Sequence, residues 1–170
     1  ADALVDEIAS LDKRKKELRA QLAKVRHTIA AAELYATVNE PLNAFHDTPH
    51  AKIRLGTLPL SVKEEFFKAM AEEPLTDCAA LGADADNLLV LAAAHTSCAA
   101  FDKILQTYSF AVCPFDESLS GEAFYANLKA REGEIVAELD KNRADTYALH
   151  TRIPFLKTYS DRIAFELEKA

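Results

Sequence analysis

Apolar side chains recur in steps of seven residues along the last part of the chain, from Ser120 onward. One set of steps comprises Leu128, Ile135, Asn142, Leu149, Leu156, Ile163 and Ala170, and the other comprises Tyr125, Glu132, Leu139, Thr146, Ile153, Ser160 and Leu167. The intervening residues are largely Glu, Lys, Arg, Asp and Ala. This pattern predicts one long helix with a narrow apolar seam, which is typical of a coiled coil and requires a partner helix.

The beginning of the chain carries the same pattern and supplies that partner. Its two sets of steps are Ile8, Lys15, Leu22, Ile29 and Ala36, and Leu4, Leu11, Leu18, Val25 and Ala32. The predicted helix runs to about Val38 and ends before Pro41, because a proline disfavours the helical conformation of the residue that precedes it. We therefore expect the two helices to pair antiparallel along their seams.

Two residues of the last helix modify this prediction. Asn142 occupies a seam position in an otherwise apolar row, where a single polar side chain commonly fixes the register of a helix pair. Pro154 lacks the N–H that would bond to the carbonyl of His150, and its ring clashes there. We therefore expect a kink between Tyr147 and Phe155.

The segment between the two helices is made of short elements. Residues 52–58 alternate polar and apolar side chains, as a strand with one buried face does. Ser61 and Glu64 form a capping box that can open a helix, and Thr96 can cap a second one. The predicted elements are a strand at 52–58, a helix at 61–73, strands at 77–83 and 88–93, a helix at 96–108 and a strand at 109–113.

This βαββαβ order predicts one four-stranded antiparallel sheet with both helices on one face, the ferredoxin-like arrangement. The expected fold is α+β, a long antiparallel two-helix coiled coil with an inserted ferredoxin-like lobe at its tip. Its parts are a coiled-coil helix at 1–40, the lobe at 41–116 and a returning helix at 117–170, kinked near Pro154. The chain opens without methionine, so we expect it to be a fragment of a longer protein.

Composition excludes some functions. The net charge of −7 argues against nucleic acid as a partner, because binding it needs clustered Lys and Arg. The predicted strands 52–58 and 88–93 also carry no aromatic residue on which RNA bases could stack. The basic run Lys13–Lys16 has Asp and Glu within one or two turns, which indicates a solvated helix surface. We find no run of eighteen apolar residues and no signal peptide.

Cysteine and histidine residues are scattered along the chain. Cys78, Cys98 and Cys113 are widely spaced among apolar residues, which is typical of a reducing compartment and leaves their individual roles open. His46 and His50 have a proline between them and no third ligand close in sequence. We therefore interpret the two histidines as loop residues.

Other candidate groups also have a plainer interpretation. His95, Ser97 and Cys98 include nucleophile and base types, but neighbours at the start of a helix rarely point at one another. Asp84 and Asp86 are better turn formers than calcium ligands, because calcium needs more oxygen ligands than this loop offers. There is neither a Gly-rich phosphate loop nor a G-x-S-x-G elbow. The sequence predicts no catalytic, cofactor-binding or metal-binding residue.

Several pieces of the sequence together resemble a known family. The first strand ends in Gly-Thr-Leu-Pro at 56–59, the second short helix leads into Tyr-Ser-Phe at 108–110, and the closing helix ends in Tyr-Ser-Asp-Arg-Ile-Ala-Phe-Glu-Leu-Glu-Lys at 159–169. With the first helix and the apolar strand at 88–93, these pieces resemble the cytoplasmic part of subunit I of archaeal and bacterial V/A-type ATPases. That subunit is the equivalent of eukaryotic subunit a.

The resemblance implies a non-catalytic stator component of a rotary V/A-type ATPase. In that family the cytoplasmic arm links the ion-translocating membrane sector to the peripheral stalks, at the cytoplasmic face of the membrane. The implied partners are the stalk subunits E and G, with the C subunit as a further candidate. Contact with the membrane would come only through a domain missing from this chain. The resemblance implies no cofactor and no small-molecule ligand, and it names no partner-binding residue.

Two other functions are compatible with the sequence. The ferredoxin-like lobe could sense a metabolite or bind a protein, with the coiled coil transmitting the signal. Alternatively, the coiled coil could be a generic scaffold that the lobe only caps.

Overall fold

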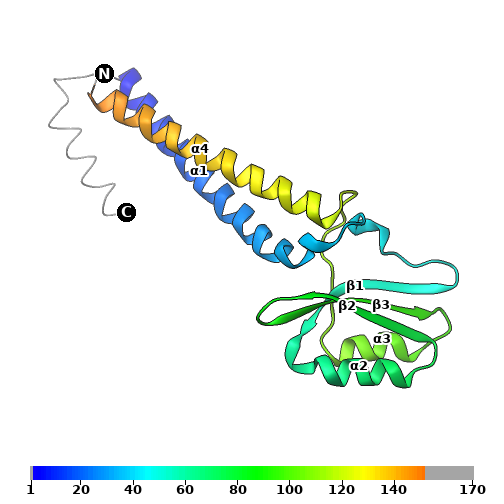
Figure 1. Ribbon diagram of the computed structural model, residues 1–170. Helices are drawn as coiled ribbons and strands as arrows, with labels where there is room; N and C mark the ends of the chain where they lie inside the picture. Colours follow the sequence, from blue (N-terminus) through cyan, green and yellow to red (C-terminus); the bar gives the residue numbers. More distant parts are fainter. Residues whose placement is uncertain (1, 152–170) are drawn as a thin grey trace. The chain divides into compact units, whose positions relative to one another are not determined.

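The computed structural model describes residues 2–151 of the chain (Figure 1). This range is α+β, with four α-helices and a four-stranded antiparallel sheet. The elements are α1 (Asp2–Ala32), η1 (Glu33–Thr37), η2 (Leu42–Ala44), β1 (Ala51–Pro59), η3 (Leu60–Val62), α2 (Lys63–Glu72), β2 (Thr76–Ala83), β3 (Asn87–His95), α3 (Ala100–Thr107), β4 (Ala111–Val112) and α4 (Gly121–Thr151), where η marks a 3-10 helix. The expected kink at Pro154 and the end of the last helix lie outside the described residues.

The chain divides into two compact units. One unit consists of the residues up to 28 and those from 128 onward, and we call its described part the helix pair. The other unit consists of residues 29–127, and we call it the lobe.

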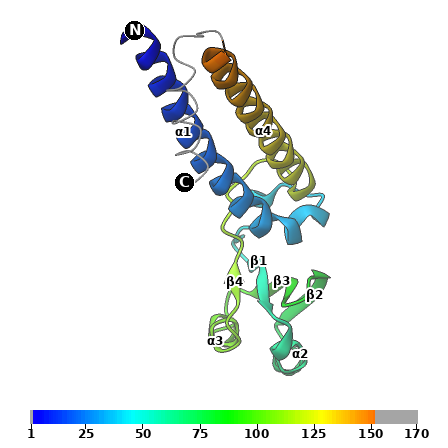
Figure 2. The ribbon, with the colours of Figure 1, turned by 90° about the vertical axis from the view of Figure 1, so that its left-hand side faces the viewer.

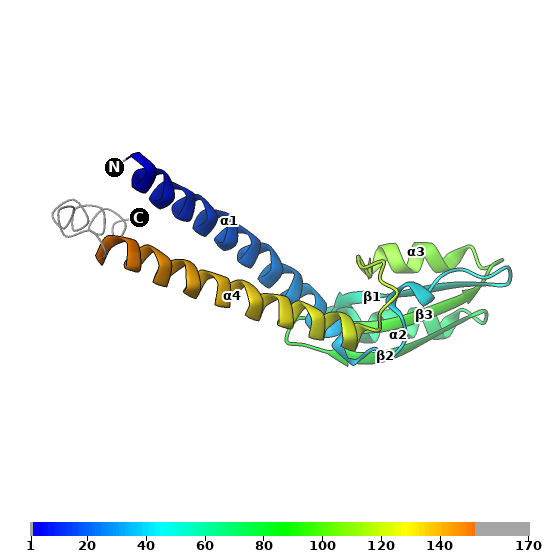
Figure 3. The same cartoon turned by 90° about the horizontal axis from the view of Figure 1, so that it is seen from above.

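In the helix pair, α1 and α4 run antiparallel (Figure 3). The α4 partners of Leu11, Arg14 and Gln21 are Asn142, Glu138 and Arg131, so the partner numbers fall as the numbers in α1 rise. Leu18 and Ile135 are fully buried, and the other positions of the heptad within this unit are at least partly covered. Within residues 2–151 we find no helix with the length and apolar character needed to cross a membrane.

The sheet of the lobe has the strand order β2-β3-β1-β4 (Figure 2). The central strands β1 and β3 pair antiparallel along their whole length, beginning with Ala51 opposite His95. β2 pairs with β3 and contains a bulge between Ala80 and Gly82. β4 is short and pairs with only part of β1, so the first half of β1 extends beyond it.

Asp84 forms the turn between β2 and β3, which confirms the predicted turn. Its Oδ1 accepts hydrogen bonds from the backbone N–H of Asp86 at 2.8 Å and of Asn87 at 2.7 Å. These two bonds favour the ionised carboxylate and therefore lower the pKa of Asp84.

One face of the sheet is covered by α2 and α3, which supply Phe66 and Phe101 to a shared core (Figure 1). Both rings are fully buried. The buried residues of this core are Leu58, Phe66, Met70, Leu88, Val90, Ala92, Ala94, Cys98, Phe101 and Leu105. Because the even-numbered residues of β3 all point into this core, its odd-numbered residues face the opposite side.

The opposite face is covered by η1, η2 and the start of α4. Tyr35, Val38 and Leu42 are buried there against Leu55 and Leu89 of the central strands. Phe115 and Phe124 complete this second core, with their ring centroids 4.9 Å apart. The sheet therefore lies between two apolar layers, both of which belong to the lobe.

The end of α3 places Phe110 against β1. Ser109 has a φ of 59°, in the left-handed region. The N–H of Phe110 donates to the carbonyl of Leu105 at 2.9 Å and the N–H of Ser109 donates to that of Gln106 at 3.3 Å, which is the Schellman pattern of a helix end. The ring of Phe110 then packs on Gly56, where an added Cβ would lie 2.7 Å from a ring carbon. The Gly-Thr-Leu-Pro and Tyr-Ser-Phe segments thus meet in the fold.

Tertiary contacts shift several element ends from their predicted positions. α1 ends at Ala32 rather than near Val38, because the chain tightens into η1 and turns Tyr35 and Val38 into the second core. The predicted cap at Ser61 is absent; η3 precedes α2, whose N-cap residue Val62 makes no side-chain cap bond.

The second short helix and the last strand are also shorter than predicted. α3 begins at Ala100 rather than at Thr96, because the Thr96 hydroxyl donates to the carbonyl of Pro49 at 3.2 Å instead of capping a helix. β4 covers only Ala111–Val112 of the predicted 109–113, because Ser109 is left-handed and cannot belong to a strand.

Candidate functional site

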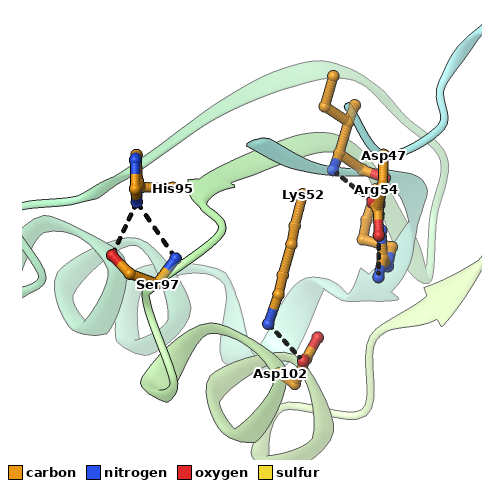
Figure 4. Close-up of polar contacts among 7 residues, drawn as sticks. Asp47, Lys52, Arg54, His95, Ser97 and Asp102 are labelled. Atoms are coloured by element: carbon orange, nitrogen blue, oxygen red, sulfur yellow. Dashed lines mark hydrogen bonds and ion pairs between the residues drawn. The ribbon is translucent and has the colours of Figure 1, made fainter. Parts of the chain in front are cut away.

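The segment that precedes β1 closes the free edge of that strand (Figure 4). Thr48 donates its N–H to the carbonyl of Ala51 at 2.8 Å and accepts the N–H of Ala51 with Oγ1 at 3.0 Å. Next along the strand, Asp47 Oδ1 accepts the N–H of Ile53 at 3.1 Å, and the guanidinium of Arg54 donates to the carbonyl of Ile53 at 2.9 Å. The backbone groups that a neighbouring strand would use are therefore already occupied here.

Asp47 and Arg54 also form an ion pair in this segment (Figure 4). The hydrogen bond from Arg54 and the N–H of Ile53 hold the pKa of Asp47 below its usual value, because both favour the ionised carboxylate.

His95 and Ser97 contact each other directly (Figure 4). This differs from the expectation that the side chains of these neighbouring residues would not point at one another. His95 Nδ1 lies 2.7 Å from Ser97 Oγ and accepts the N–H of Ser97 at 3.2 Å. Nδ1 is therefore an acceptor, so the Ser97 hydroxyl donates to it and the neutral ring carries its proton on Nε2.

A hydroxyl hydrogen-bonded to a neutral imidazole is one element of nucleophilic catalysis. In the catalytic arrangement a third group orients the base, and within residues 2–151 we find no such partner for His95. Both side chains are exposed, and Cys98 donates its N–H to the carbonyl of His95 at 2.9 Å to close the turn. The contact accordingly stabilises the turn between β3 and α3.

The same end of the sheet is held by contacts between distant segments. Lys52 of β1 donates to Asp102 of α3 at 3.1 Å (Figure 4). Thr96 donates its N–H to the carbonyl of His50 at 3.1 Å. His46 and His50 lie in the loop before β1, and no three His, Cys, Asp or Glu side chains within residues 2–151 are placed to hold a metal ion.

The three cysteines occupy different environments and are all free thiols. Cys98 is buried in the core beneath α2 and α3. Burial raises the pKa of the Cys78 thiol, on β2, and of the Cys113 thiol, beside the second core. Burial also raises the pKa of the Tyr35 phenol, next to Cys113. Cys78, Cys113 and Tyr35 therefore stay protonated and uncharged at neutral pH.

The outer edge of β2 is the feature that sequence reasoning missed. Within residues 2–151, β2 pairs with β3 alone, and no strand lies on its other side (Figure 2). Leu81 within β2 and Leu75 just before it are 41% and 50% exposed. One feature of the sequence coincides with this surface: the chain carries no Lys or Arg between Lys68 and Lys103.

The described residues thus define one class of architecture, an antiparallel helix pair joined to an α+β lobe. Among solved structures, the chain is similar to "Crystal structure of the cytoplasmic N-terminal domain of subunit I, homolog of subunit a, of V-ATPase", with a TM-score of 0.54 and 17% sequence identity. The alignment covers 85% of this chain and 49% of that chain, so this chain spans about half the length of the solved structure. At this identity the likeness shows a shared fold. No protein-family model and no curated protein sequence matches the chain.

Proposed function

We propose that this chain is a non-catalytic stator component of a rotary V/A-type ATPase. In this role it forms part of the cytoplasmic arm that links the ion-translocating membrane sector to the peripheral stalks. The observation that carries the proposal is the fold shared with the cytoplasmic domain of subunit I over 85% of the chain. The chain would lie at the cytoplasmic face of the membrane and reach the bilayer only through a further domain.

The contacts of the helix pair support a role in bearing load. Arg14 pairs with Glu138 at 2.9 Å and Arg26 pairs with Glu132 at 3.1 Å, each across the two helices. Individually such exposed pairs add little stability, because water and salt screen them. Together with the buried seam, they oppose sliding of one helix along the other. We interpret the pair as an antiparallel coiled coil that serves as a stiff connecting arm.

We interpret the lobe as the ferredoxin-like distal lobe of such an arm. Its strand order and its two helices on one face support this interpretation. In this role the lobe would bind a helical part of the peripheral stalk, which is made of the E and G subunits. The C subunit is a second candidate partner. Lys52 of β1 contacts Asp102 of α3, and Thr96 contacts the loop before β1. These contacts hold one end of the sheet in place, so the lobe can bind a partner without refolding.

Crosslinking to the stalk subunits tests the proposal with the whole chain. A photoreactive amino acid replaces Lys68 on α2, Lys103 on α3 or Lys141 on α4, all of which are exposed. Each chain is mixed with purified E and G subunits and irradiated. We expect crosslinks from at least one lobe position and few from the matched position on α4. Equal crosslinking from all three, or none from the lobe, would contradict a stalk-binding lobe.

A further inference from the structure

The two edges of the sheet differ in a way that points to a binding surface. At one edge, β4 and the bonds of Thr48, Asp47 and Arg54 occupy the outer backbone groups of β1. At the other edge, β2 has no strand beyond it within residues 2–151. Proteins commonly protect long edge strands with Lys, Pro, a β-bulge or a covering segment. β2 contains neither Lys nor Pro, and its bulge, between Ala80 and Gly82, leaves the stretch before Ala80 regular. We call the outward side of Thr76–Ala83 the open edge.

The hydrogen-bond phase of β2 identifies the groups on the open edge. The N–H of His95 donates to the carbonyl of Leu75 at 2.9 Å, so residue 75 points its backbone groups toward β3. Backbone groups alternate sides in an antiparallel ladder, so those of Thr76, Cys78 and Ala80 point outward. The N–H of Thr76 already donates to the carbonyl of Glu73 at 3.3 Å, and that of Cys78 to Asp77 Oδ1 at 2.9 Å. Ala80 is exposed and lies just before the bulge.

The side chains at the open edge are small. Ala79 and Ala80 are exposed alanines, and Gly82 follows the exposed Leu81. Because the side chains of a strand stand above and below the sheet, they leave the backbone groups of this edge accessible at the spacing of about 4.8 Å between neighbouring strands. The exposed leucines at 75 and 81 flank this stretch and offer apolar contacts to alternate side chains of an added strand.

The charge around the open edge selects the occupant. Between Lys68 and Lys103 the acidic residues are Glu72, Glu73, Asp77, Asp84, Asp86 and Asp102. Of these six acidic residues, only Asp102 forms an ion pair within residues 2–151, and its partner is Lys52. A second copy added antiparallel would bring the acidic residues at the start of each strand beside those that follow the end of the other, and like charges repel. A strand with basic residues at its ends would instead meet opposite charge.

We propose that the open edge of β2 binds an extended segment of another protein as an added fifth strand, with Lys or Arg on both sides of a run of β-branched residues. Main-chain hydrogen bonds to β2 would supply affinity, and the acidic surroundings would supply selectivity. The proposal rests on the geometry of the sheet and goes beyond the stator role, whose expected partner is helical. Either proposal can therefore fail without the other.

Titration of the ¹⁵N-labelled full chain with synthetic peptides tests this proposal. The probe is acetyl-Lys-Lys-Val-Thr-Val-Thr-Val-Lys-Arg-amide, and the controls are the same core flanked by Glu and the basic peptide N-methylated on alternate residues. We expect saturable amide shifts centred on residues 76–83 with the basic peptide only, weakening as salt is raised. Equal binding of either control, shifts centred elsewhere, or no saturable shift at millimolar peptide would overturn the proposal.

Matched variants at Ala80 separate the edge from its surroundings. Ala80→Pro removes the outward N–H at an edge position where proline can be accommodated, so binding should be lost. Ala80→Lys keeps the backbone and places a cation against the basic peptide, whereas Ala80→Val keeps the backbone and raises strand propensity. Binding should weaken with Ala80→Lys and persist with Ala80→Val. Unchanged binding by Ala80→Lys would contradict the site, even if the proline variant fails to fold.

Neutralising the charge tests the selectivity. The triple variant Glu73→Gln/Asp77→Asn/Asp86→Asn should bind the basic peptide about tenfold more weakly, since it removes three exposed opposite-charge contacts.

Sedimentation velocity of the peptide-free chain tests whether a second copy of the chain occupies the open edge instead. A concentration-dependent dimer that is lost with Ala80→Pro would mean that a second copy occupies the edge, and would overturn the basic-peptide proposal.

Discussion

Asn142 of α4 donates a hydrogen bond of 2.9 Å from Nδ2 to the backbone carbonyl of Leu11 in α1. Its side chain is only 5% exposed and lies among apolar seam residues. Thr146 donates its hydroxyl to the carbonyl of Asn142 at 2.8 Å, one turn further along α4. Sliding α4 by one heptad would remove Asn142 from Leu11 and bury its amide without this partner. We infer that the contact favours this register, which is the role expected of a single polar seam residue.

We expect Asn142→Leu to raise stability while relaxing the register. A buried leucine gains apolar burial and loses one modest hydrogen bond, for a net gain of about 1 kcal/mol. Chemical denaturation measures the gain. Distances between spin labels at the exposed residues 13 and 141, in a chain whose native cysteines are replaced by alanine, measure the register. The distribution should be narrow for the parent and broad for Asn142→Leu.

Thr146→Leu is the matched control, because Thr146 is also a seam residue but its hydroxyl bonds only within α4. It should stabilise the helix pair without broadening the spin-label distances. If Asn142→Leu also kept a single narrow distance, the amide would not be what fixes the register.

Gly56→Ala should destabilise the lobe by about 2–4 kcal/mol. The added methyl would overlap the Phe110 ring, 2.7 Å away, and the carbonyl of Ala111, and neither group is a flexible side-chain end. Gly133→Ala is the matched control, because a Cβ there meets nothing within 4 Å. Since Gly133 lies within α4, this control should gain about 0.5–1 kcal/mol. Urea denaturation measures both, and equal effects would disprove the close approach at Gly56.

Ser109→Gly should stabilise the lobe by about 1 kcal/mol, because glycine adopts the left-handed conformation without the strain of a Cβ. The hydrogen bonds of this helix end involve only backbone groups, so the substitution removes none of them. Ser109→Ala keeps the Cβ and should show no such gain. A stabilisation by alanine equal to that by glycine would mean that the gain does not come from the backbone conformation. Thermal unfolding followed by circular dichroism distinguishes the two outcomes.

The sequence predicts the parts of this fold that follow from local periodicity. The helix seams follow from a seven-residue repeat, and β1 follows from alternation along residues 52–58. By contrast, the end of α1 depends on where Tyr35 is buried, and the start of α3 depends on a bond from Thr96 to a residue 47 positions earlier. Such contacts exist only once the chain has folded, so no local pattern encodes them.

The candidate surfaces were less predictable than the fold. Whether an edge strand is open depends on its neighbours in space, and the sequence of β2 is the same whether or not a strand lies beside it. The closure of the β1 edge depends likewise on Asp47 and Arg54, seven residues apart, meeting at the same backbone groups. Of the features of the β2 edge, only the absence of basic residues between Lys68 and Lys103 can be read from the sequence, and it indicates the charge of this surface rather than its geometry.

The ion pair of Asp47 and Arg54 should make closure of the β1 edge depend on pH. The pKa of Asp47 is lowered in the folded chain, mainly by Arg54, so the carboxylate stabilises the folded state above its unfolded pKa of about 3.9. This contribution is lost as the pH falls from about 4 through the lowered folded value. The difference in unfolding free energy between the parent and Asp47→Asn should therefore be largest near neutral pH and vanish in acid.

Arg54→Gln should flatten this pH dependence, because it removes the main cause of the lowered pKa of Asp47. Denaturation of the four chains of the double-mutant cycle at several pH values measures it, and a difference that grew toward acid would contradict the assigned role of Arg54.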